Sequence, residues 1–182
     1  KKVQQYNDDR SPLFQKFRLD AQLQDIFNPK VNLKSGGYLI IDQTEALVAI
    51  DVNSGKATRE RSIEDTALKT NLEAAEEFAR QSRLRDLSGL IVIDFIDMEE
   101  GKNRNLVEKK LKDAMRKDRA RIQIGEISNF GLLELSRQRL RPSVIENSSE
   151  ICSQCGGSGR IQSIEVSACL LYTSPSPRDN TT

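Results

Sequence analysis

The sequence contains no histidine and no tryptophan, and aromatic residues make up only 5% of its 182 residues. The absence of histidine excludes Ser-His and Cys-His catalytic pairs, as well as any metal site with imidazole ligands in this chain. No apolar run approaches the roughly 18 residues that a membrane-spanning helix needs, and the first residues lack the apolar segment of a signal peptide. A hydrolase built from these residues must therefore use carboxylates and a metal ion.

Cysteine is also scarce, with three residues in total, and two of them form a Cys-x-x-Cys motif at Cys152 and Cys155. In a reducing compartment this spacing indicates a metal or redox motif, and the glycines that follow favour a turn in which two thiolates bind zinc. Two ligands are half of a tetrahedral site, so closure needs a second pair from another chain or from residues beyond this one. An unmetallated thiol pair is the alternative. We expect a cytoplasmic location, with any attachment to the inner membrane made outside this chain.

Charge is balanced over the whole chain, with 28 basic and 27 acidic residues, so the net charge of +1 does not indicate a polyanionic partner. Residues 102–121 are an exception, because nine basic and three acidic residues give this stretch a charge of +6. A solvated helix face is the ordinary interpretation. Contact with a phosphate backbone is the alternative, to which Arg137, Arg139 and Arg141 would add. Phe130 is the main aromatic candidate for base stacking.

Two apolar runs end in an aspartate: residues 47–50 precede Asp51, and residues 90–93 precede Asp94. Between them, apolar residues recur at helical spacing from 63 to about 87, after a capping-box pattern that begins at Ser62. A helix that crosses between neighbouring strands makes those strands parallel, so both aspartates are expected at one edge of a sheet.

Neighbouring strands lie ~4.8 Å apart, a separation at which Asp51 and Asp94 can share one hard divalent cation. Asn53 is expected to hydrogen-bond a carboxylate or a metal-bound water and fix its orientation. Asp97 is expected to point differently and to be a structural residue or to lie just outside the site. The alternative is that these aspartates only form turns or helix caps.

The remaining pattern predicts an α/β fold, a mixed sheet with flanking helices. We expect a hairpin of strands at 38–41 and 46–52, and a second helix capped by Asn103 or Asn105. A third strand is expected at 121–124. Residues 1–35 suit a helix or short elements, and residues 130–141 fit either a strand or a helix.

Seven segments together resemble the catalytic core of the ribonuclease E/G family, nearest to its ribonuclease E branch. They are GGY at 36–38, QTEAL at 43–47, IDVNSG at 50–55, KTNLEAA at 69–75, GLIVIDFIDM at 89–98, FGL at 130–132 and SRQRL at 136–140. The resemblance implies the end of a ribonuclease H-like subdomain at 1–27, a deoxyribonuclease I-like catalytic subdomain at 28–147 and a zinc-link at 148–165. Residues 166–182 resemble a translated adapter, and we expect this tail to be non-native or disordered.

The resemblance also implies a function: a Mg²⁺-dependent endoribonuclease that cleaves single-stranded RNA in RNA processing and decay and leaves 5′-phosphate products. Mg²⁺ would lie between Asp51 and Asp94, supported by Asn53. Cys152 and Cys155 would share Zn²⁺ with the same pair of another protomer, giving dimers that assemble into tetramers. Arg121 matches an arginine near the family's 5′-phosphate pocket, and partners in an RNA-decay assembly are expected.

The chain begins at Lys1, and we expect it to be a fragment of a longer protein that is nearly inactive alone. Two other functions stay open. One is a non-catalytic, zinc-linked module that binds RNA or acts as a scaffold. The other is a metal-dependent phosphatase of small molecules, which the basic stretch at 102–121 disfavours.

Overall fold

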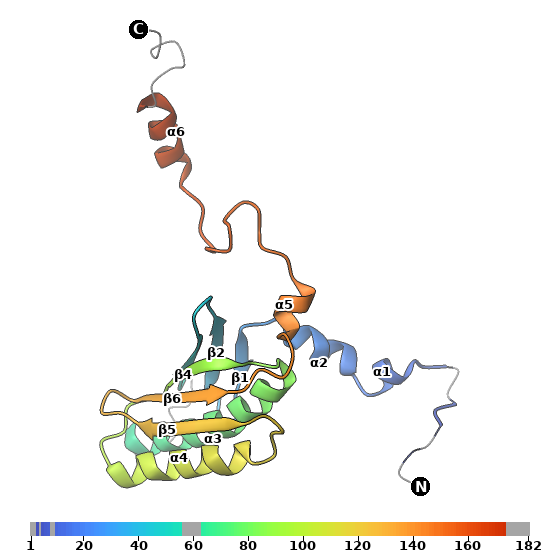
Figure 1. Cartoon of the computed structure of the whole chain (residues 1–182), viewed down its shortest axis with the longest axis vertical. Helices are drawn as coiled ribbons and strands as arrows, with labels where there is room; N and C mark the ends of the chain where they lie inside the picture. The colour runs from blue at the N-terminus through green and yellow to red at the C-terminus, as the bar shows by residue number, and fades with distance from the viewer. Residues whose placement is uncertain (1–2, 4, 8–9, 56–62, 174–182) are drawn as a thin grey trace. The chain divides into compact units, whose positions relative to one another are not determined.

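The structure is a computed structural model that describes residues 3, 5–7, 10–55 and 63–173 (Figure 1). The chain divides into two compact units, Lys1–Asn147 and Ser148–Thr182. The first unit contains a six-stranded sheet with flanking helices. None of the described helices combines the length and the apolar character needed to cross a membrane.

The sheet is mixed, with the strand order β1-β2-β3-β4-β6-β5. Only the central β3–β4 pair is parallel, and the other four neighbouring pairs are antiparallel. The strands are β1 (Lys30–Asn32), β2 (Tyr38–Gln43), β3 (Val48–Asn53), β4 (Gly89–Asp94), β5 (Ile122–Ile127) and β6 (Leu132–Arg137). The predicted α/β fold with a mixed sheet and flanking helices is confirmed.

The predicted hairpin and crossover are present at the centre of this sheet. β2 and β3 form the hairpin, in which Thr44 accepts and donates hydrogen bonds with Leu47 in the turn. Helix α3 (Ile63–Leu84) then returns the chain so that β4 lies parallel to β3. Ser62, the predicted cap of this helix, lies outside the described residues.

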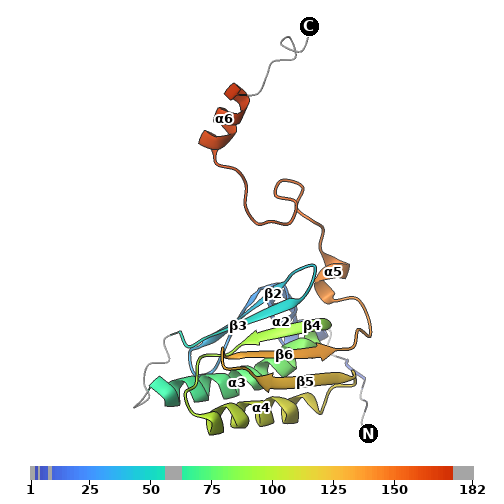
Figure 2. The same ribbon diagram turned by 60° about the vertical axis from the view of Figure 1, so that its left-hand side comes forward.

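The two faces of the sheet differ in their surroundings. Helices α3 and α4 (Gly101–Met115) lie together along one face, as both views show (Figures 1 and 2). We call this the covered face, because alternate strand residues such as Ile50, Ile91 and Leu133 join the helices in the core there. The residues between them face the other way and are half-buried or exposed, and we call their side the open face.

The start of α4 departs from the sequence prediction. Neither Asn103 nor Asn105 caps this helix, which follows Glu100. Asn103 is buried, and its side-chain amide donates a hydrogen bond of 2.6 Å to Glu64, at the start of α3. Glu64 also accepts backbone N–H groups of Glu99 and Glu100. The α4 start is therefore bound by an acid from another helix, which local sequence patterns do not reveal.

The remaining elements complete the two units. Residues 1–35 form short elements, as expected: helices α1 (Leu13–Lys16) and α2 (Leu19–Asp25) and the strand β1. The ambiguous stretch at 130–141 contains strand β6. Helix α5 (Val144–Ser148) follows, and the second unit contains α6 (Ile164–Thr173). The tail predicted at 166–182 thus includes most of α6, and its residues 174–182 lie outside the described part of the chain.

Candidate active site

Asp51 and Asp94 lie side by side on the open face. They are register partners in the parallel pair β3–β4, and both side chains are exposed. Parallel neighbouring strands are ~4.8 Å apart, so two carboxylates in register can bind the same small ligand. The crossover helix α3 produces this arrangement, because it brings two strands that are distant in the sequence into parallel contact.

Asn53 lies next to this pair and contacts it directly. Residues two apart on a strand share a face, so Asn53 follows Asp51 on the open face. Its side-chain amide donates a hydrogen bond of 2.7 Å to Asp51 Oδ2. This bond restricts the Asp51 carboxylate and leaves its other oxygen, Oδ1, for a further ligand.

Negative charge accumulates around Asp94. Partial burial, followed by the charges of Asp51 and Asp97, raises the pKa of Asp94 above its usual value. Among the described residues, no Lys or Arg forms an ion pair with Asp51 or Asp94. The charge of Asp97 acts on Asp94, which agrees with a position just outside the acid pair. A cation would relieve this repulsion.

A buried asparagine holds the loop that follows β4. Asn71, on α3, is fully buried, donates its amide N–H to Ile96 O at 2.8 Å and accepts Ile96 N–H at 3.0 Å. Ile96 lies between Asp94 and Asp97, so α3 positions the backbone that carries both carboxylates. This role of Asn71 is not among those predicted from the sequence. A polar residue in helical register with the inward-facing Ala67, Ala74 and Phe78 was the available signal.

The turn between β5 and β6 closes against the same loop. Gly131 has φ +77°, and a Cβ on it would lie 2.9 Å from Phe95 O, so a larger residue would be strained there. In return, Gly131 O accepts the Phe95 N–H at 3.1 Å. Glycine therefore allows this turn to approach the end of β4 and the acid pair.

The chemistry of these groups fits a hard divalent cation. Two carboxylates and one amide supply only oxygen and nitrogen atoms, and carboxylate oxygens are the ligands that Mg²⁺ prefers. Within the described ranges, no group of three or more His, Cys, Asp or Glu side chains could hold a metal ion. Mg²⁺ commonly binds through one or two carboxylates and keeps several waters, so a pair is a sufficient anchor.

The second unit contains the Cys-x-x-Cys turn. Gly156 N–H donates to Cys152 O at 2.8 Å, which closes the turn, and Cys152 and Cys155 are free thiols. Hydrogen bonds from the N–H groups of Gly159 and Gly157, and from Cys152, lower the pKa of the Cys155 thiol. A stabilised thiolate suits zinc binding, although this chain alone supplies only two ligands.

Arg121 lies far from the acid pair. Arg121 directly precedes β5, and the first residue of β5 pairs with Arg137, the last residue of β6. Arg137 also pairs with the first residue of β4, whereas Asp94 is the last residue of β4. Arg121 is exposed, and its carbonyl accepts the Gln138 N–H at 2.9 Å. Arg121 and Asp94 thus lie at opposite ends of the strands, and the structure does not bring them together.

Several other basic residues are already paired with acids. Arg137 is buried and pairs with Asp118 at 2.9 Å, so the prediction that Arg137 contributes to a phosphate-binding surface is wrong. Arg139 pairs with Glu146, and Arg141 pairs with Asp86. On the 102–121 stretch the ion pairs are Lys102–Glu100, Lys110–Glu76, Lys112–Glu108 and Arg116–Asp113. These pairs reduce the charge available to a polyanion.

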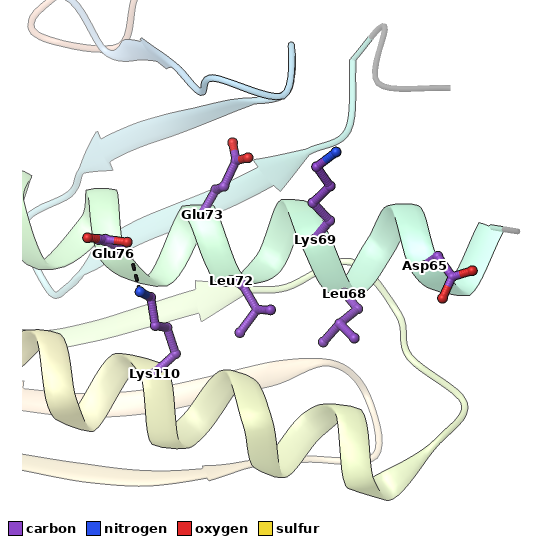
Figure 3. A pocket seen from close by; sticks show the side chains of 7 residues that line it. All are labelled: Asp65, Leu68, Lys69, Leu72, Glu73, Glu76 and Lys110. Atoms are coloured by element: carbon purple, nitrogen blue, oxygen red, sulfur yellow. Dashed lines mark ion pairs between the residues drawn. The ribbon is translucent and has the colours of Figure 1, made fainter. Parts of the chain in front are cut away.

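A hollow of about 380 Å³ lies between α3 and α4, away from the acid pair. Figure 3 shows Leu68 and Leu72 pointing from α3 toward α4, with Glu76 and Lys110 joined by an ion pair of 2.9 Å. The hydrogen bond from Lys110, followed by its charge, lowers the pKa of Glu76. The hollow thus combines apolar side chains with a charged rim, and none of the predicted site residues lines it.

Comparison with known proteins identifies the family. The model of the ribonuclease E/G family matches residues 1–140. The chain is 52% identical to Ribonuclease E of Escherichia coli, and the match covers 93% of this chain and 16% of that protein. It is 42% identical to Ribonuclease G of Escherichia coli, over 86% of this chain and 32% of that protein. A chloroplastic Ribonuclease E/G-like protein of Arabidopsis thaliana is 43% identical over 85% of the chain. The chain thus spans a third or less of these relatives, and it belongs to the ribonuclease E/G family.

Proposed function

We propose that this chain is the metal-holding part of an endoribonuclease that cleaves single-stranded RNA in RNA processing and decay. The observation that carries the proposal is the in-register pairing of Asp51 with Asp94 on the open face of the sheet. Membership of the ribonuclease E/G family, and relatives named Ribonuclease E and Ribonuclease G, support the choice of substrate.

In this proposal Asp51 and Asp94 hold Mg²⁺, and Asn53 orients Asp51 through the observed hydrogen bond. When bound, Mg²⁺ supplies a Lewis acid that activates water and stabilises charge on the phosphate. Asn71 holds the Asp94–Asp97 loop in place through Ile96. The open face leaves both carboxylates accessible to an extended strand of RNA, and cleavage leaves a 5′-phosphate and a 3′-hydroxyl.

Further parts of the proposal rest on the family resemblance. Residues 28–147 form a deoxyribonuclease I-like subdomain, and Arg121 lies near a 5′-phosphate pocket completed by segments outside this chain. Cys152 and Cys155 share Zn²⁺ with the same pair of a second protomer, so that dimers form and assemble into tetramers in the cytoplasm. The low pKa of Cys155 supports thiolate ligation.

We also propose that the chain is an incomplete part of the catalytic region and is nearly inactive alone. Its coverage of only 16% of the Escherichia coli Ribonuclease E supports this. The test is to assay a single-stranded oligonucleotide with the isolated chain and with the longer protein that carries it. Robust cleavage by the isolated chain would refute this part of the proposal.

The central experiment compares Asp51→Ala with Asp42→Ala in the longer protein. Asp42 is a matched control, because it is an exposed aspartate on the same face, in register with Ala49 rather than with a second acid. We expect Mg²⁺-dependent cleavage to be lost only in Asp51→Ala. If neither the wild-type protein nor the control cleaves RNA but both bind it, the chain is a non-catalytic RNA-binding module. Turnover of mononucleotides instead of RNA would indicate a phosphatase.

A second experiment tests the zinc-link. We expect the mass of the longer protein in solution to fall when a chelator removes Zn²⁺, and Cys152→Ser to have the same effect. Gln154→Ala is the control, because this exposed residue lies between the two cysteines and has no thiolate to offer. An unchanged mass in both the chelated protein and Cys152→Ser would exclude a zinc-linked oligomer.

A further inference from the structure

An exposed aromatic residue lies in a turn that adjoins the acid pair, and it takes no part in the chemistry described so far. Phe130 is 82% exposed, the most of the six phenylalanines, whereas Phe78 and Phe95 are buried in the core. It lies in the turn between β5 and β6. A single exposed apolar side chain is common on protein surfaces, so the position of Phe130 matters here more than its exposure alone.

The turn that carries Phe130 is held at several points. Phe130 N–H donates to Ser128 Oγ at 3.2 Å, and Ser128 N–H donates to Leu132 O at 2.8 Å. Arg104, on α4, donates from Nη1 to Asn129 Oδ1 at 3.3 Å. The backbone under the ring is therefore fixed before any ligand arrives, which reduces the entropy lost on binding.

The same turn adjoins the acids. The position of a Cβ on Gly131, the next residue, lies 4.0 Å from Asp94 Oδ1 and 3.1 Å from Asp97 Oδ1. Leu132, one residue further, is the register partner of Asp94. Without a cation, the two carboxylates beside this turn disfavour a phosphate group there, whereas an uncharged base can lie against the ring.

We propose that Phe130 is a stacking platform for the base of a nucleotide adjacent to the phosphate held at Asp51 and Asp94. This inference rests on the function proposed above and adds to it a residue that positions the RNA. Every base has an aromatic face, so the contact tolerates any sequence. Bases within a duplex already stack on one another, so the platform favours single-stranded RNA.

The first test measures stacking without cleavage. Single-stranded RNA oligonucleotides carrying 2-aminopurine at successive positions are bound to the longer protein in the absence of Mg²⁺. We expect quenching of the 2-aminopurine fluorescence at one position, lost in Phe130→Ala and retained in Phe130→Tyr. Leu140→Ala is the control, because Leu140 is 58% exposed and lies beyond the opposite end of β6.

The second test measures cleavage with Mg²⁺ present. Alanine substitution of a stacking aromatic residue weakens binding by roughly 5- to 140-fold, so Phe130→Ala should raise KM by that factor with little change in kcat. A substrate with an abasic site at the quenched position should show the same loss with the wild-type protein. On the abasic substrate, Phe130→Ala should cause no further increase in KM.

The outcomes separate this inference from the proposed function. Normal quenching and normal KM in Phe130→Ala would overturn the platform. An equal increase in KM on the intact and the abasic substrates in this variant would also overturn it. Quenching that depends on Phe130 without any cleavage would support the platform and overturn the nuclease. Cleavage that depends on Asp51 but not on Phe130 would support the nuclease and overturn the platform.

Discussion

The two faces of the sheet each carry a pair of charged groups, and the pairs differ in kind. On the covered face, Arg137 and Asp118 have opposite charges, lie 2.9 Å apart and expose only 4% and 2% of their side chains. On the open face, Asp51 and Asp94 have the same charge and are exposed. A buried charge must be compensated if the chain is to fold. Like charges placed together instead oppose folding, so the open-face pair is better explained by a ligand than by stability.

The largest expected effect concerns the oppositely charged pair on the covered face. Asp118→Asn leaves Arg137 buried without its counter-charge, and we expect the free energy of unfolding to fall by about 3–5 kcal/mol. Urea denaturation of the first unit would measure it. The control is Asp113→Asn, since Asp113 forms an exposed pair with Arg116 and should change stability by less than about 1 kcal/mol. Equal losses of stability in the two variants would show that the buried pair contributes no more than the exposed pair.

The next prediction compares adjacent leucines of β6 that point to opposite faces. Leu133 is fully buried on the covered face, so Leu133→Ala should cost about 2–5 kcal/mol. Leu132 is 37% exposed on the open face, and Leu132→Ala should cost less than about 1 kcal/mol. Thermal or urea unfolding measures both. Similar losses would mean that another part of the protein covers the open face.

The third prediction tests the like-charged pair. Asp94→Asn should reduce the rate of Mg²⁺-dependent RNA cleavage by the longer protein at least ~10²-fold, because a charged metal ligand is lost. The same substitution should leave the unfolding free energy unchanged or raise it, because it removes repulsion from Asp51 and Asp97. Oligonucleotide cleavage and urea unfolding are measured on the same preparations. Retained cleavage, or a large loss of stability, would contradict the assignment.

The smallest expected effect is a pH dependence of stability. Burial raises the pKa of Asp118, but hydrogen bonds from Arg137 and from Ala120 N–H, together with the charges of Arg137 and Arg83, outweigh it. The pKa in the folded protein therefore lies below the usual value. A lowered pKa means that the stabilisation is complete above the unfolded-state value of about 4 and is lost as pH falls through the folded-state pKa. One group changes stability by at most about 1.4 kcal/mol per pH unit. Asp118→Asn should flatten the acid limb of a pH–stability curve; an unchanged limb would assign the acid sensitivity to other groups.

The central elements were predictable because their signals are local. Apolar alternation and turn residues mark the β2–β3 hairpin, helical spacing marks α3, and together they place Asp51 beside Asp94. The edge strand β1 has only three residues, too few for a periodic pattern. The start of α4 depends on Glu64, which lies 39 residues before its partner Asn103, and no local signal shows that contact.

Along the chain, the order of strand, crossover helix and strand sufficed to place two acids at one sheet edge, because chain connectivity and strand handedness leave few alternatives. Which charges are compensated depended on three-dimensional packing. Arg137 and Asp118 are 19 residues apart and become partners only when β6 joins the sheet next to β4. The roles of Asn71 and Gly131 likewise arise from contacts with Ile96 and Phe95. Such contacts bring together residues that are distant in sequence, and side-chain types alone do not specify them.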